Sequence, residues 1–83
     1  MKKFIEEMKA NANEAYESNK PYYEDRLKRA IKECAERGGT VAYVAIQADK
    51  HKANGFERYL DENNLKWEPA GRIQSWVCYT VEF

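Results

Sequence analysis

The residues best suited to chemistry are a cluster of cations, Lys50-His51-Lys52, that follows a short apolar stretch of the chain. If that stretch is a strand and a helix comes next, the cluster lies where many α/β proteins bind ligands, beside the backbone N–H groups of a helix start. Two lysines and these donors could hold a phosphate or a carboxylate, and Arg72 could extend the site to nucleic acid. A solvated loop, whose charges only add solubility, explains the same residues more simply.

The sequence does not contain the patterns that are typical of catalysis or metal binding. His51 is the only histidine, and the two cysteines, Cys34 and Cys78, form no CxxC pair and no Cys/His cluster. Adjacent carboxylates such as Glu6 and Glu7 point about 100° apart on a helix, so they do not converge on one substrate. No phosphate-binding loop or nucleophile motif occurs either. We therefore expect a protein that is not an enzyme and that uses no cofactor and no metal.

Tyrosine, tryptophan and arginine offer another kind of site, because these residues supply most of the binding energy at protein interfaces. Trp76 shares its strand parity with polar residues, and Tyr43 could join it on an open sheet face if Ala42, Val44 and Ile46 face the helices. Three outcomes are open for such a face. The first helix covers it, a protein partner or a second copy buries it, or it stacks unpaired bases. The candidate partner-binding residues are Tyr22, Arg29, Tyr43, Trp67 and Trp76.

Length and charge exclude several classes of protein. The chain has 83 residues, enough for one small domain over residues 1–83 but few for a deep catalytic cleft beside a core. Its 14 basic and 14 acidic residues give a net charge of +0, which argues against a nucleic-acid clamp. No apolar run approaches the ~20 residues that span a membrane, and the first residues contain no apolar leader. We expect a cytoplasmic protein with two reduced thiols and no membrane contact.

Three helices are expected to position these residues. Apolar residues recur on one helical face over residues 3–17 and again over residues 21–37. Pro21 separates the two helices, and Gly38 ends the second as a left-handed cap. A third, short helix begins at Asn54, whose side chain suits the N-cap. The residues that share one face of the first helix are Phe4, Ile5, Met8, Ala12, Ala15 and Tyr16.

Three strands complete the expected fold. Residues 40–48 are apolar on both parities, as in a buried strand, and a hairpin follows with arms at 65–68 and 72–83 and a turn at Pro69-Ala70-Gly71. A crossover helix between strands favours parallel pairing of 40–48 with one arm. In a second possible order the last strand is central, and 40–48 becomes an edge with no charge to prevent pairing. The expected core residues are Leu27, Ile31, Val44, Phe56, Leu60, Val77 and Val81.

These elements predict an α+β fold of two layers, in the order α-α-β-α-β-β, with a mixed three-stranded sheet and helices on one face. A winged-helix-like fold uses similar parts and is the alternative. The expected function is that of a small intracellular protein-binding module, an inhibitor or adaptor of a larger protein or complex, with a protein partner or a second copy as its ligand. The alternative is a nucleic-acid-binding domain that uses the basic loop and the aromatic sheet face.

Overall fold

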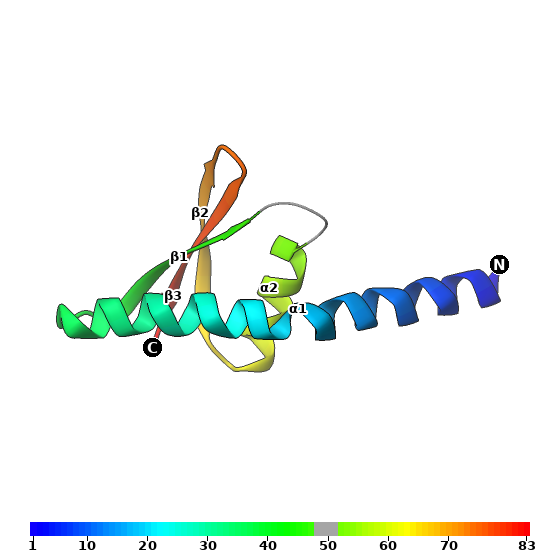
Figure 1. Ribbon diagram of the computed structural model, residues 1–83, viewed down its shortest axis with the longest axis horizontal. Coiled ribbons are helices and arrows are strands. Elements are labelled where there is room, and N and C mark those ends of the chain that lie inside the picture. The colour runs from blue at the N-terminus through cyan, green and yellow to red at the C-terminus, as the bar shows by residue number, and fades with distance from the viewer. Residues whose placement is uncertain (48–51) are drawn as a thin grey trace.

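The computed structural model describes residues 1–47 and 52–83 and shows an α+β fold, with two helices and a three-stranded antiparallel sheet (Figure 1). Only one helix precedes the first strand, so the predicted order with two leading helices is wrong. The elements are α1 (Lys2–Glu36), β1 (Val41–Gln47), α2 (Lys52–Glu62), β2 (Lys66–Ile73) and β3 (Trp76–Glu82).

α1 continues through Pro21, where the sequence predicted a break. A proline inside a helix costs about 3 kcal/mol because it removes one backbone hydrogen bond. Tertiary packing offsets this cost, since Tyr16 and Tyr23, on either side of the proline, are both buried, with ring centroids 6.2 Å apart. The predicted end of the helix is confirmed, because Gly38 has φ 82° and donates its N–H to the carbonyl of Ala35 at 2.9 Å.

The first turns of α1 form an arm that projects beyond the rest of the fold (Figure 1). Phe4, Ile5 and Met8, which belong to the apolar face of this helix, are 58%, 46% and 44% exposed. The apolar periodicity therefore predicted a helix correctly but not its burial. Tyr16 is the first buried residue of α1, so the core-facing part of the helix begins there.

β3 lies in the centre of the sheet, in the order β1-β3-β2, and pairs antiparallel with both neighbours. The predicted parallel pairing of residues 40–48 is therefore wrong, and the second predicted order is confirmed. The crossover through α2 does connect two strands that run in the same direction, because β1 and β2 both oppose β3. They lie on opposite sides of β3, however, and do not pair with each other.

The hairpin turns later than the sequence predicted. Residues 74–75 form the turn, with Gln74 at φ 55°, and Pro69 lies inside β2. The register between β2 and β3 shifts between Pro69 and Arg72, as in a β-bulge, and Gly71 at φ 96° accommodates the bulged backbone. An edge strand tolerates proline because one side of its ladder is unpaired, so the residues that looked like a turn became a bulge.

Aromatic rings form the centre of the core, on the face of the sheet that the helices cover. Tyr23 of α1 lies 5.7 Å from Phe56 of α2, and Phe56 lies 5.3 Å from Tyr79 of β3, measured between ring centroids. The predicted core is confirmed, with Ile31 and Val77 only partly buried against it. Its fully buried members among the predicted residues are Leu27, Val44, Phe56, Leu60 and Val81.

α2 begins at Lys52, before Asn54, so the predicted start at Asn54 is wrong. Gly55 consequently lies inside the helix, where it brings α2 close to α1. A Cβ atom at this position would collide with the hydroxyl of Tyr23 and come within 3.0 Å of its Cζ. The glycine therefore serves a close approach between two helices and not a helix start.

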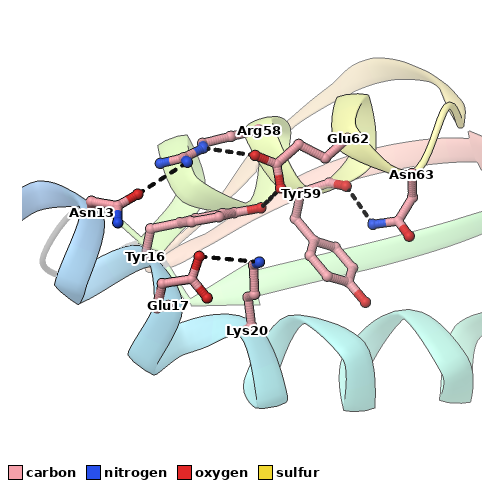
Figure 2. Close-up of polar contacts among 8 residues, drawn as sticks. All are labelled: Asn13, Tyr16, Glu17, Lys20, Arg58, Tyr59, Glu62 and Asn63. Carbon is pink, nitrogen blue, oxygen red and sulfur yellow. Dashed lines mark hydrogen bonds and ion pairs between the residues drawn. The ribbon is translucent and has the colours of Figure 1, made fainter.

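Polar side chains fasten α1 to α2 at the base of the arm (Figure 2). The Tyr16 hydroxyl donates to Oε2 of Glu62 at 2.6 Å, and the Arg58 guanidinium donates to Oε1 of Glu62 at 3.0 Å and to Oδ1 of Asn13 at 3.1 Å. Arg58 Cζ also lies 3.9 Å from the centroid of the Tyr16 ring. The hydrogen bonds from Tyr16 and Arg58 hold the pKa of the Glu62 carboxyl below its ordinary value.

Candidate interaction surface

The C-terminal half of α1 crosses the edge strand β1 at an angle (Figure 1), and its side chains hydrogen-bond to the strand. Nε and Nη2 of Arg26 donate to the carbonyl of Ala45 at 3.2 and 3.0 Å. The backbone N–H of Gln47 donates to the hydroxyl of Tyr22 at 3.2 Å. Every second residue of an antiparallel edge strand turns its N–H and C=O outward. Arg26 and Tyr22 therefore occupy backbone groups that could otherwise pair with another strand.

A third side chain of α1 reaches the same edge. The Cys34 thiol donates to the carbonyl of Val41 at 3.1 Å. Gly39 leaves room for this thiol, because a Cβ at that position would lie 2.7 Å from Cys34 Sγ. β1 is thus an uncharged edge, as the second predicted order implied, but side chains of α1 cover part of it.

A groove follows the line where α1 meets β1, and we call it the α1–β1 groove. It consists of two hollows of about 230 and 260 Å³, and Ala30, Glu33 and Tyr43 line both. Because the two hollows share these residues, they form one continuous depression along the edge strand. Its further lining includes Arg26, Arg29, Cys34, Arg37 and Val41.

Tyr43 is the aromatic residue of this groove. Its side chain is 55% exposed, and it lies on the sheet face opposite the buried Ala42 and Val44. The neighbouring Cys78 thiol raises the pKa of the Tyr43 hydroxyl. Trp76 is half-buried, and the guanidinium of Arg26 lies 5.2 Å from its ring centroid. The expected aromatic open face is therefore present, with Arg26 against one of its two rings.

Arginines dominate the charge of the groove. Arg29 and Arg37 are 73% and 78% exposed. Arg29 forms an ion pair with Asp25 of α1 at 3.3 Å, and Arg37, the residue after α1, forms one with Glu33 at 3.8 Å. The sequence-based choice of residues included Arg29 but missed Arg26 and Arg37. Their spacing could have revealed them, because positions 26, 29, 33 and 37 fall on one helical face, next to the core-facing stripe.

Of the five predicted partner-binding residues, Arg29 and Tyr43 line the α1–β1 groove. Tyr22 and Trp76 line neither hollow and lie nearby, against Gln47 and Arg26. Trp67 lies elsewhere. Its indole Nε1 donates to Oδ1 of Asp61 in α2 at 2.8 Å, and its ring lies 5.6 Å from that of Tyr79. Trp67 is therefore packed on the side of the sheet that the helices cover. A binding residue would have to point to the exposed face of the sheet. The position of Trp67 along β2 makes its side chain point to the opposite face.

The predicted anion site falls largely outside the described part of the molecule. Lys50 and His51 lie outside the described residues. Lys52 is the first residue of α2, but its side chain is not among those that the structure describes. Arg72 is exposed on β2 and faces Val77 of β3 in the ladder, and it lines neither hollow of the α1–β1 groove. The structure thus does not join Arg72 to the aromatic and arginine residues of the groove.

Two features bear on other classes of site. Among the side chains that the structure describes, no group of three His, Cys, Asp or Glu residues could hold a metal ion. Within the same part of the chain, neither helix is long and apolar enough to cross a membrane. Both cysteines, Cys34 and Cys78, are free, and Cys78 is buried.

Comparison with known proteins yields no match, since no family model, no curated protein and no solved structure is significantly similar to the chain. Function is therefore inferred from the geometry of the surface alone.

Proposed function

We propose that this chain is a non-enzymatic protein-binding module, an inhibitor or adaptor of a larger protein, and that the α1–β1 groove is its binding surface. The observation that carries the proposal is the exposed ring of Tyr43 beside a row of arginines in a continuous groove. Tyrosine, tryptophan and arginine are the residues most enriched among those that dominate binding energy.

A foreign protein is a better ligand than a second copy paired edge to edge. Side chains of α1 cover part of the outer side of β1. On the opposite edge, β2 contains Pro69, a bulge and the charged residues Lys66 and Glu68. These features oppose strand pairing between molecules. The free thiols of Cys34 and Cys78 suit a reducing compartment, so we assign the module to the cytoplasm.

Affinity capture with three forms of the full-length chain tests the proposal: the unchanged protein, Tyr43→Ala and Ile73→Ala. Ile73 is a matched control because it is 60% exposed and lies at the far end of the hairpin, away from the groove. Quantitative mass spectrometry should find proteins that the unchanged chain and Ile73→Ala retain and that Tyr43→Ala loses. The proposal fails if no retained protein depends on Tyr43 while circular dichroism shows that all three forms are folded.

A further inference from the structure

The α1–β1 groove has an excess of positive charge that its own acidic residues do not balance. Among the residues that the structure describes, three guanidinium groups line it, those of Arg26, Arg29 and Arg37, against one carboxylate, that of Glu33. Asp25, which pairs with Arg29, reduces the excess but does not remove it. Arg26 donates to a neutral carbonyl group, so its charge stays uncompensated by that contact. A partner that complements this surface must carry negative charge.

The arginines at the two ends of the groove are available for exchange. Arg29 and Arg37 hold their partners Asp25 and Glu33 in exposed ion pairs. Such exposed pairs contribute little to stability, so a carboxylate from a partner can replace them at little cost. A guanidinium also accepts a second carboxylate through its remaining N–H groups, since it has five of them arranged in a plane.

The dimensions of the groove suit a short extended segment. At about 1.5 Å per residue, α1 spans about 16 Å between Arg26 and Arg37. An extended chain advances about 3.3 Å per residue, so about five residues fill this length. Acidic side chains at alternate positions repeat at about 7 Å and can meet the arginines, while the side chains between them face the apolar surface of Ala30, Val41 and Tyr43.

From this charge, exposure and length, we infer that the partner of the α1–β1 groove presents an extended acidic peptide segment, with aspartate or glutamate alternating with apolar residues. This inference rests on the proposed protein-binding function and specifies the chemistry of the ligand. The arginines select the carboxylates, and Tyr43 contributes the apolar contact between them. Since α1 already occupies several outward groups of β1, side chains and not a new backbone ladder supply the contacts.

Selection from a random twelve-residue peptide library against the immobilised full-length protein tests the inference without knowledge of the natural partner. Peptides that survive selection should be enriched in aspartate and glutamate at alternate positions. Selection of no peptide, or of peptides without acidic enrichment, overturns the inference. If that result accompanies Tyr43-dependent capture of a protein, the binding module stands and only the acidic ligand is rejected.

A titration of the most enriched peptide then locates the site. The double variant Arg29→Glu/Arg37→Glu should weaken binding by at least about tenfold, measured by fluorescence anisotropy. The matched control is Lys28→Glu/Lys32→Glu, because these exposed lysines belong to the same helix, lie outside the groove and give the same change of net charge. Equal weakening in both double variants indicates a non-specific charge effect and overturns the inference.

Discussion

Tyr23 illustrates how single residues hold this fold together. Its ring touches Tyr16, Phe56 and Tyr59 and is completely buried, and burial raises the pKa of its hydroxyl. The sequence placed it on the buried stripe of α1, but the close contact with Gly55 could not be predicted. The sequence instead indicated a helix start at Asn54, and this interpretation gave no sign that Gly55 lies inside α2 and contacts α1.

Gly55→Ala should lower the free energy of unfolding by about 1–3 kcal/mol, because the new methyl group collides with a buried ring. Chemical denaturation measures the change. The variant Tyr23→Phe removes the nearest atom of the collision, so the double variant should lose less stability than the two single variants together. Additive losses, or an unchanged stability of Gly55→Ala, would show that α2 does not approach α1 in this way.

Glu62 should make the stability of the contact between α1 and α2 depend on pH. The hydrogen bonds from Tyr16 and Arg58 lower its folded pKa, while in the unfolded chain the pKa is about 4.3. The contribution of the ionised Glu62 carboxylate to the free energy of unfolding is therefore complete above the unfolded pKa. It is lost as the pH falls through the folded pKa. Thermal unfolding between about pH 7 and about pH 3 should show a smaller loss of stability for Glu62→Gln than for the unchanged chain.

A control for this pH effect is Glu7→Gln, on the arm of α1 and far from α2 (Figure 1). Its loss of stability on acidification should match that of the unchanged chain. An identical pH profile for Glu62→Gln and the unchanged chain would contradict the role of Glu62.

At the scale of elements, the sequence predicted the positions of helices and strands better than it predicted how the strands pair. The helical and extended periods of α1, β1 and β3 were correct, and so was the cap at Gly38. The break at Pro21 and the turn at Pro69 were wrong for one reason: proline marks a local preference that packing or an edge position can override. The pairing of β1 depends on contacts distant in sequence, which no local pattern contains.

The arm of α1 provides a direct comparison between helical pattern and burial. Ile5→Ala and Met8→Ala should each change the free energy of unfolding by less than about 0.5 kcal/mol, because both side chains are exposed. Leu27→Ala and Leu60→Ala, at buried positions of α1 and α2, should each cost about 2–5 kcal/mol. Denaturant titrations of the four variants measure this contrast. A loss at Ile5 and Met8 as large as at the two leucines would mean that the arm is packed in solution.

At the scale of the whole molecule, the aromatic core and the α1–β1 groove, which we propose as a binding surface, lie in different places. α1, α2 and one face of the sheet enclose the aromatic core, and the groove lies at the edge of β1 beside the arginines. Two of the residues that line the groove, Arg29 and Tyr43, were among those that the sequence singled out by residue type. It could not predict the groove itself, because the groove exists only where residues near position 30 of α1 lie beside Tyr43 of β1.

The most direct measurement of the central claim, that the α1–β1 groove binds a protein, is the affinity of a captured partner for Tyr43→Ala and for Ile73→Ala. Calorimetric titration with the purified partner should give a Kd at least about tenfold higher for Tyr43→Ala than for the unchanged chain, since an interface hot spot contributes about 2 kcal/mol or more. Ile73→Ala should bind like the unchanged chain. An unchanged Kd for folded Tyr43→Ala would contradict the assignment of the groove as the binding surface.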